Sequence, residues 1–127
     1  MFGIILVSHS QKITDGTKEM IEEMTGSSSN VRIISAGGTG DGRLGTNAVM
    51  IMEVIEANSD CEHILIFCDI GSAILSSETA VELIEDEELT ARIDIMDCPL
   101  VEGAFAVAVQ ASVCQDKASV LRELEYI

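Results

Sequence analysis

The feature that most constrains the fold is a series of short apolar runs that alternate with segments of helical periodicity. The first run, Phe2–Val7, is apolar at nearly every position and does not alternate with polar residues. This pattern is typical of a parallel strand that helices cover on both faces. Comparable runs predict further strands over residues 31–35, 63–68 and 91–96.

Helical segments separate these runs. The expected helices lie between Ser10 and Gly26, over residues 46–57 with Thr46 as the N-cap, over 72–85, over 99–113 and around 120–124. Strands that alternate with helices imply βαβ units with right-handed crossovers. We therefore expect an α/β fold with an open, mainly parallel sheet of about four strands and helices on both faces. At 127 residues the chain suits a single domain over residues 1–127.

Charge excludes several classes of partner. The chain has 22 Asp and Glu against 7 Lys and Arg, a formal net charge of -15. Such a charge opposes binding to nucleic acid or to an anionic membrane, so a partner attracted by charge should be basic. The run Phe2–Val7 is too short to span a bilayer and lacks the basic start and cleavage site of a secretory signal. The sequence therefore predicts a cytoplasmic protein.

The four cysteines are Cys61, Cys68, Cys98 and Cys114. They form no C-x-x-C pair, and no histidine lies at the spacing of a metal ligand. We expect neither a zinc site nor a disulfide framework, and we interpret these residues as reduced and mostly buried small apolar side chains.

Sites in open α/β sheets gather beyond the carboxyl ends of the strands. Four segments occupy such places: residues 8–10, 37–45, 69–72 and 97–102. His9 is the most informative residue among them, because it directly follows a buried strand and opens a helix whose first N–H groups can bind an anion. A neutral imidazole there could accept a phosphoryl group. The alternative is a helix-capping or merely polar loop histidine.

Asp69 ends the third expected strand, and neighbouring parallel strands bring such ends within side-chain reach of each other. A carboxylate that accepts from Nδ1–H of His9 would leave Nε2 as the nucleophile. Asp69 could instead cap the following helix, and both roles can coexist. His63, by contrast, begins a strand beside Glu62, which favours an ordinary edge or surface role.

The segment around residues 37–45 contains Gly40, Gly42 and Gly45 at the spacing of a dinucleotide fingerprint. It follows the second expected strand instead of the first, and the chain has room for only half of a nucleotide-binding fold. We interpret it as a flexible loop that frames a site entered by a partner, with a plain connecting loop as the alternative. The acidic run near residues 82–88 indicates a solvated helix end.

Four motifs in this order resemble one family. They are Gly3-Ile4-Ile5-Leu6-Val7-Ser8-His9-Ser10, Ala36-Gly37-Gly38-Thr39 with Asp41-Gly42 and Leu44-Gly45-Thr46, Asp69-Ile70-Gly71-Ser72-Ala73, and Pro99-Leu100-Val101-Glu102-Gly103-Ala104. Nearly the whole chain is similar to the phosphocarrier subunit of the phosphoenolpyruvate-dependent dihydroxyacetone kinase, a relative of the mannose-type IIA domains of the bacterial sugar phosphotransferase system. The stretch after Asp69 lacks the double glycine followed by Ser-Pro of the sugar transporters, which favours the dihydroxyacetone branch over a sugar-transport IIA component.

The resemblance implies that His9 is phosphorylated by the phosphohistidine of the carrier HPr and passes the group to ADP on a nucleotide-binding kinase subunit. The resulting ATP would phosphorylate dihydroxyacetone on a further subunit. Asp69 would orient His9, and five neighbours would contribute to substrate binding: Ser10, Gly38, Thr39, Gly71 and Ser72. The resemblance also implies a homodimer. We expect neither a metal ion nor a cofactor. The chain carries no HPr-like or enzyme-I-like segment, so it would depend on a separate HPr.

Two other functions compete with this one. A receiver-like module would be phosphorylated on Asp69, but receivers need an acidic pair after the first strand, where this chain has Ser8, His9 and Ser10. A flavin- or nucleotide-binding module could use the loop of residues 37–45, but few aromatic residues are available to hold a flavin.

Overall fold

A parallel sheet of four strands forms the centre of the molecule. The computed structural model describes residues 1–26 and 28–126. The strands are β1 (Phe2–Val7), β2 (Val31–Ser35), β3 (His63–Cys68) and β4 (Ile93–Met96). They lie in the order β2-β1-β3-β4, and every neighbouring pair is parallel. The predicted open α/β fold is confirmed.

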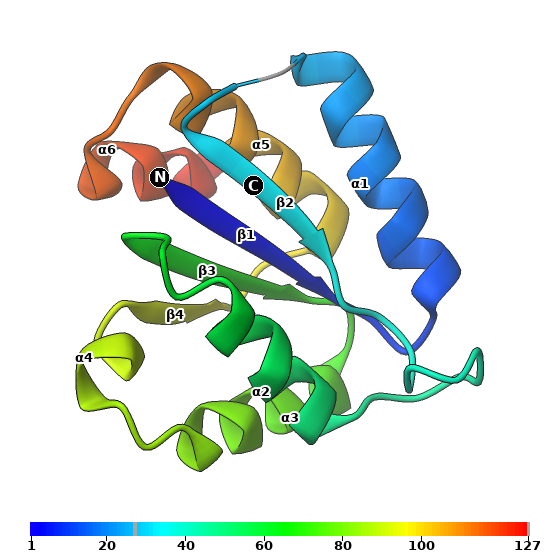
Figure 1. The fold of residues 1–127 in the computed structure, drawn as a ribbon. Coiled ribbons are helices and arrows are strands. Elements are labelled where there is room, and N and C mark those ends of the chain that lie inside the picture. Colours follow the sequence, from blue (N-terminus) through cyan, green and yellow to red (C-terminus); the bar gives the residue numbers. More distant parts are fainter. Residues whose placement is uncertain (27, 127) are drawn as a thin grey trace.

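Helices cover both faces of this sheet (Figure 1). They are α1 (Gln11–Thr25), α2 (Ala48–Ala57), α3 (Gly71–Leu83), α4 (Glu87–Thr90), α5 (Leu100–Val113) and α6 (Lys117–Arg122), followed by the 3-10 turn η1 (Glu123–Tyr126). None of the helices in the described part of the chain combines the length and apolarity needed to cross a membrane.

Two apolar layers hold the helices to the sheet. On one face, Ile4 and Leu6 of β1 pack in a cluster with Ile21 of α1 and with the inner side of α5. On the other face, Ile5 and Val7 pack with side chains of α2 and α3. Because successive residues of a strand point to opposite faces, the continuous apolar run of β1 supplies both layers. Burial on both sides is therefore the reason that this run does not alternate.

The strand order reverses beside β1. From β1 the chain crosses to β2 on one side, and from β2 it returns to β3 on the other side of β1. The register pairs Val7 with Cys68 and Leu6 with Ser35, so the segments that follow β1, β2 and β3 leave the sheet together. Such a reversal is where open α/β sheets place their sites.

Several expected boundaries are wrong in detail. Helix α2 begins at Ala48 and is capped by Asn47, whose side chain accepts from the N–H of Met50, while the expected cap Thr46 bonds Ser76 instead. Strand β4 begins at Ile93, because the preceding residues form α4 with Asp86 as its N-cap. The expected solvated acidic end therefore contains a short capped helix. Asp and Asn side chains satisfy the first helical N–H groups well, which explains both shifts.

Helix α5 is apolar on most sides, and the chain itself covers much of it. It packs on β1, β2 and β3 and also contacts α1, α6 and η1. Leu100, Ala104, Val107 and Ala111 are buried in this contact. The composition of α5 is thus largely explained within one chain.

Candidate phosphotransfer site

His9 and Asp69 lie side by side at the carboxyl ends of β1 and β3. Nδ1 of the His9 ring is 3.1 Å from Oδ1 and 3.4 Å from Oδ2 of Asp69. The backbone N–H of His9 also donates to Oδ2, at 3.1 Å. The two side chains are 28% and 20% exposed, so the pair is partly sheltered yet open to a partner. The juxtaposition predicted from the sequence is confirmed.

Ser8 completes this arrangement and was not among the predicted site residues. It is fully buried, and its hydroxyl donates to Oδ2 of Asp69 at 2.9 Å. Oγ of Ser8 also accepts from the N–H of Ser10 at 3.1 Å. Ser8 therefore links the carboxylate to the turn that carries His9. A hydroxyl directly after a run of buried apolar residues is the sequence signal that could have indicated it.

The surroundings of Asp69 favour its ionised form. Burial raises the pKa of a carboxyl group, but hydrogen bonds from the backbone N–H groups of His9 and Ile70 and from the side chains of Ser8 and His9 outweigh it. The pKa of Asp69 is therefore lowered from its ordinary value. An ionised carboxylate can only accept hydrogen bonds, so Nδ1 of His9 carries the ring hydrogen in the neutral imidazole and Nε2 carries the lone pair.

Ser72 occupies the other side of the ring. Its hydroxyl lies in hydrogen-bonding contact with Nε2 of His9, from the first turn of α3. With the hydrogen on Nδ1, this hydroxyl donates to the Nε2 lone pair. An incoming group would have to displace it, and the freed hydroxyl could then donate to that group. Ser72, which the resemblance implies to be a substrate-binding residue, thus lies against Nε2 of His9.

The glycine-rich loop, residues 37–45, is tied to the turn that carries His9. The N–H of Gly38 donates to the carbonyl of Ser8 at 2.9 Å, and the N–H of Gly45 donates to the carbonyl of His9 at 2.7 Å. Gly38 has a φ of 76°, a conformation that side-chain-bearing residues rarely adopt. The loop therefore lies against the turn that carries His9, the place expected of a loop that frames the site.

The other expected substrate-binding residues vary in their relation to His9. Ser10 is the N-cap residue of α1 and makes no capping bond with its side chain. Gly71 is an exposed residue that opens α3. The hydroxyl of Thr39 bonds Asp41 within the loop, and its carbonyl accepts from Asn47 at 3.4 Å. No hydrogen bond joins Thr39 to His9 in the part of the chain that the structure describes.

The fourth nominated segment, residues 97–102, does not join the site by any hydrogen bond to His9 or Asp69 among the described residues. Pro99 is the N-cap residue of α5, and Leu100 is buried beneath it. Strand β4 lies at the sheet edge with β3 between it and β1, which explains the separation.

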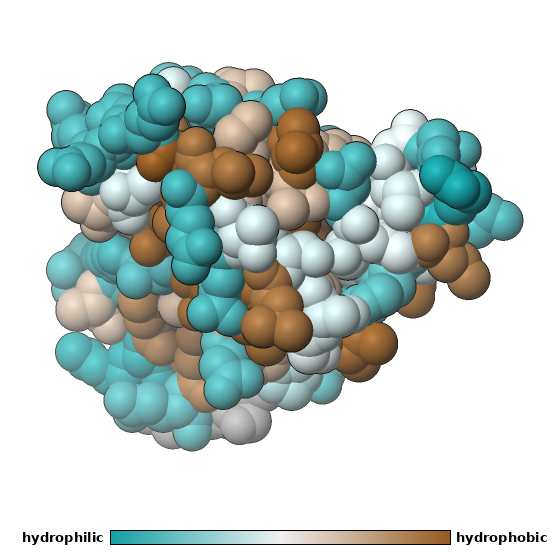
Figure 2. Space-filling model, turned by 90° about the horizontal axis from the view of Figure 1, so that it is seen from below, coloured by the Kyte–Doolittle hydropathy of each residue, from teal (hydrophilic) through white to brown (hydrophobic). Residues whose placement is uncertain are grey.

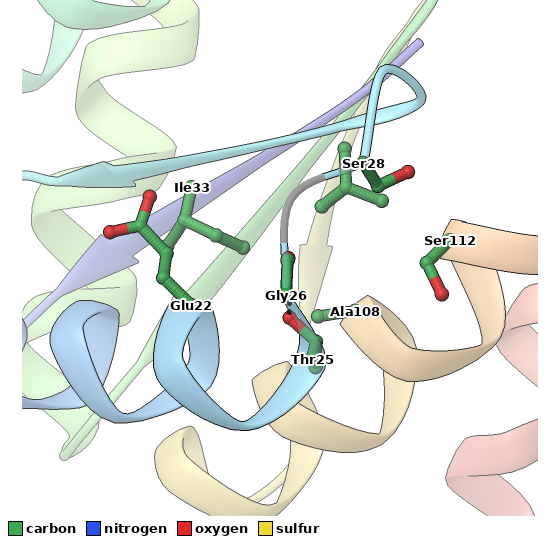
Figure 3. A pocket seen from close by; sticks show the side chains of 8 residues that line it. Glu22, Thr25, Gly26, Ser28, Ile33, Ala108 and Ser112 are labelled. Carbon is green, nitrogen blue, oxygen red and sulfur yellow. Dashed lines mark hydrogen bonds between the residues drawn. The ribbon is translucent and has the colours of Figure 1, made fainter.

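Two hollows on the surface are relevant to ligand binding, and they lie at opposite ends of the sheet. One, of about 410 Å³, opens beside Ser10 and is bounded by the start of α1 and by the loop residues Gly42, Arg43 and Leu44. Another of similar volume lies between the carboxyl end of α1, the start of β2 and α5 (Figure 3), and residues lining it include Glu22, Thr25, Ser28, Ile33, Ala108 and Ser112. Val31 pairs with Phe2, so this second hollow is at the opposite end of the sheet from His9. It contains no histidine.

The cysteines and the second histidine add no further nucleophile or metal ligand to the site around His9. Cys61 and Cys68 are buried while Cys98 and Cys114 are half-buried, and all four are free thiols. Burial raises the pKa of Cys61, Cys68 and Cys98, which disfavours the reactive thiolate. Within residues 1–26 and 28–126 no three His, Cys, Asp or Glu side chains are grouped so that they could hold a metal ion. His63 stacks near Phe2, with ring centroids 4.8 Å apart, at the other end of the strands.

Comparison with known proteins identifies relatives along almost the entire chain. Residues 3–121 match the EIIA-man family model, described as the fructose IIA component of the phosphotransferase system. A Listeria innocua protein, the phosphoryl donor subunit DhaM of phosphoenolpyruvate-dependent dihydroxyacetone kinase 2, is 61% identical over 98% of this chain and 97% of its own length. The Escherichia coli DhaM subunit is 40% identical over 88% of this chain, which spans only 24% of that longer protein.

Solved structures agree with the fold. A crystal structure of EF1359, a protein of unknown function, has a TM-score of 0.89 and 49% identity, and the match covers 98% of this chain and 93% of that one. The IIA protein associated with the fucose utilization operon of Streptococcus pneumoniae has a TM-score of 0.54 at 14% identity, covering 98% and 89%, and shows similarity of fold alone. The match to the family model and the identity with DhaM subunits show that this chain belongs to the EIIA-man family, in its DhaM branch.

Proposed function

We propose that this chain is the phosphoryl donor subunit of a phosphoenolpyruvate-dependent dihydroxyacetone kinase and that Nε2 of His9 carries the phosphoryl group. The observation that supports it most is the hydrogen bonding of the His9 ring, with Nδ1 held 3.1 Å from Asp69 and Nε2 directed to Ser72 at the open side. Relatives named as phosphoryl donor subunits of this kinase supply the substrate class.

The chemistry consists of two transfers. In the first, Nε2 of His9 attacks the phosphorus of the phosphohistidine of HPr, and the bond from phosphorus to the donor nitrogen breaks as the new bond forms. Asp69 retains its hydrogen bond to Nδ1–H and stabilises the positive charge that develops on the ring. In the second, an oxygen of the terminal phosphate of ADP attacks the same phosphorus, and Nε2 recovers its electron pair. ADP is held by the nucleotide-binding kinase subunit, and the resulting ATP serves the dihydroxyacetone-binding subunit.

Further parts of the proposal concern the state of the protein. We expect one IIA-type domain over residues 1–127, a homodimer, and a cytoplasmic location where HPr is available. A sugar-transport IIA component of the mannose type is the alternative function. The two differ in the acceptor, because a sugar-transport component would pass its phosphoryl group to a protein of the transporter instead of to ADP.

The test is phosphorylation by phosphoenolpyruvate, enzyme I and HPr, followed by addition of ADP with the kinase subunits. We expect one acid-labile, base-stable phosphoryl group, its absence in His9→Ala, and its discharge to ADP. The chain has two histidines, so His63→Gln is the matched control and should be labelled like the wild type. Labelling that persists in His9→Ala, or an acid-stable ester on Ser8 or Ser10, would contradict the proposal. Discharge only to a sugar-transport protein would favour the alternative.

A further inference from the structure

A hollow with two cations in its lining opens at Ser10, the residue after His9, in a molecule that is acidic as a whole. Of the seven Lys and Arg residues in the chain, Lys12 and Arg43 both line the hollow of about 410 Å³ that opens at Ser10. Asp15 is the one carboxylate on its wall, and it accepts a hydrogen bond from Ser35. Four other hollows on the described residues are lined by more carboxylates than cations. In this hollow the lining cations therefore outnumber the lining carboxylates, whereas the reverse holds in the other four.

The two cations are available to a ligand. Lys12 is exposed and forms no ion pair with any residue in the ranges 1–26 and 28–126. Arg43 donates to Oδ2 of Asp41 from Nη2 at 2.8 Å and from Nε at 2.9 Å, yet its side chain is 79% exposed, and its remaining N–H groups can donate to a ligand. The hollow also receives the N-terminus of the 15-residue helix α1, where the side chain of Ser10 makes no capping bond. All three features favour an anion.

The anion that fits is a diphosphate. A single phosphoryl group on Nε2 of His9 would lie at Ser72, whereas the hollow is lined by the residues that follow His9 and by the loop, without His9 or Ser72 themselves. Its volume exceeds what one phosphoryl group requires. The second transfer also brings the larger charge, because ADP carries about three negative charges toward a chain of net charge -15. A local positive charge is needed most at that step.

We infer that Lys12 and Arg43 bind the phosphates of the acceptor nucleoside diphosphate when the kinase subunit presents it to phosphorylated His9. This inference rests on the proposed function and adds to it the residues that receive the acceptor. The cations lower the repulsion between the diphosphate and the acidic chain while its terminal oxygen attacks the phosphorus. The bond between Nε2 and phosphorus breaks, and the phosphoryl group leaves on the nucleotide.

The test measures the two half-reactions separately. Single-turnover experiments give the rate of His9 labelling by phospho-HPr and the rate of discharge to ADP on saturating kinase subunit. The double variant Lys12→Gln/Arg43→Gln should reduce the ratio of the discharge rate to the labelling rate by roughly 10- to 100-fold, the loss expected for charge-assisted hydrogen bonds. Lys12→Arg should keep most of this ratio. Lys18→Gln is the matched control, because it removes the same charge from α1 outside the hollow.

A binding measurement separates the nucleotide from the protein that carries it. The double variant, once phosphorylated, should bind the ADP-loaded kinase subunit more weakly than the wild type does, with a much smaller change for the nucleotide-free subunit. Equal weakening of both would assign the cations to contact with the protein and overturn the inference. An unchanged ratio, or a loss shared equally by labelling and discharge, would overturn it too. If wild-type His9 is not labelled at all, the proposed function itself fails, which is a different result.

Discussion

Asp69 is the acceptor on which the geometry around His9 depends. Its two oxygens accept from the ring and the backbone N–H of His9, from the hydroxyl of Ser8 and from the N–H of Ile70. A single carboxylate thus holds the turn after β1, the buried serine and the start of the α3 segment. Asp69 therefore both orients the ring of His9 and stabilises the local structure.

Replacing Asp69 by asparagine should slow phosphoryl transfer without preventing it. Asn keeps one acceptor for Nδ1–H but loses the charge that stabilises the phosphorylated ring, so we expect a loss on the order of 10²- to 10⁴-fold. Single-turnover labelling by phospho-HPr measures this. Glu53→Gln, an exposed carboxylate on α2, is the control. Unchanged rates would remove Asp69 from the site, and complete loss of label with His9 intact would support phosphorylation of Asp69 itself.

The stability supplied by Asp69 should depend on pH. Its pKa is lowered in the folded chain, so its ionised form stabilises the fold above the ordinary carboxyl pKa, and this stability is lost as the pH falls through the lowered value. At neutral pH we expect Asp69→Asn to reduce the free energy of unfolding by about 1 to 3 kcal/mol. The difference from the wild type should shrink in acid. Urea unfolding at several pH values tests this, and a difference that grows in acid would contradict it.

Ser8 should act by positioning Asp69. Ser8→Ala removes a donor to the carboxylate and leaves the N–H of Ser10 without its acceptor, so we expect slower transfer and a loss of about 1 to 3 kcal/mol in stability. It should also raise the pKa of Asp69, which carboxyl NMR titration measures. Ser77→Ala is the control matched in burial, because among the described residues the hydroxyl of Ser77 hydrogen-bonds only with the thiol of Cys68, at 3.5 Å. If the pKa of Asp69 and the transfer rate are the same in both variants, Ser8 has no positioning role.

At the scale of elements, the glycine-rich loop and the first turn of α1 form one unit. The N–H of Gly37 donates to the hydroxyl oxygen of Thr14 at 3.0 Å, and the hydroxyl of Ser35 lies 2.8 Å from the same oxygen. Together with the bonds from Gly38 and Gly45 to the turn after β1, these contacts fix the loop against the helix. Position 37 has no room for a side chain, since a Cβ there would overlap the Thr14 hydroxyl and lie 2.7 Å from the carbonyl of Ser10.

Gly37→Ala should therefore displace the loop from α1. We expect a loss of about 1 to 3 kcal/mol in stability from overpacking, together with slower transfer because the loop frames His9. Gly16→Ala is the control, because nothing lies within 4 Å of a Cβ at that position of the same helix. That substitution should raise stability by about 0.5 to 1 kcal/mol. Thermal unfolding and single-turnover labelling check both expectations, and equal behaviour of the two variants would show that the close approach at Gly37 is unimportant.

At the scale of the molecule, the carboxyl ends of the strands carry the proposed chemistry while the remaining surface is acidic and partly apolar. Seen from below, hydrophobic side chains lie among hydrophilic ones, and a lobe projects to one side (Figure 2). Val49 of α2 and Leu75 and Leu83 of α3 are exposed by 50%, 65% and 47%. Exposed apolar side chains also lie on α1 and α5, among them Met24 and Val113, and apolar surface of this kind favours association with another protein.

We predict that the chain is a homodimer in solution. Burial of apolar surface between two copies would stabilise the pair, and salt should strengthen it by screening the repulsion between two chains of net charge -15. Sedimentation over a concentration series should give about twice the chain mass of 13.6 kDa at micromolar concentration. A species of single-chain mass throughout the series, at low and at moderate salt, would contradict the prediction.

Local patterns in the sequence determined the elements and the principal residues of the site. The apolar run Phe2–Val7 requires cover on both faces, which led to a parallel sheet with helices on each side. The place of His9 and Asp69 directly after two such strands predicted their contact, because parallel strands end at the same edge. These inferences depend on the order and spacing of residues along the chain, which can be read directly from the sequence.

Contacts between distant segments were decided only by the tertiary structure. The bond from Ser8 to Asp69 joins residues 61 positions apart, and the hollow with two cations in its lining forms where α1 meets the loop. Residues 97–102 make no hydrogen bond to His9 among the described residues, in keeping with the edge position of β4, which no local pattern reveals. The choice of Asn47 over Thr46 as a cap was likewise settled by Ser76, which takes the threonine hydroxyl across the gap between α2 and α3. Hydrogen bonds and charges act over a few ångströms in space, and only the folded chain determines which side chains come that close.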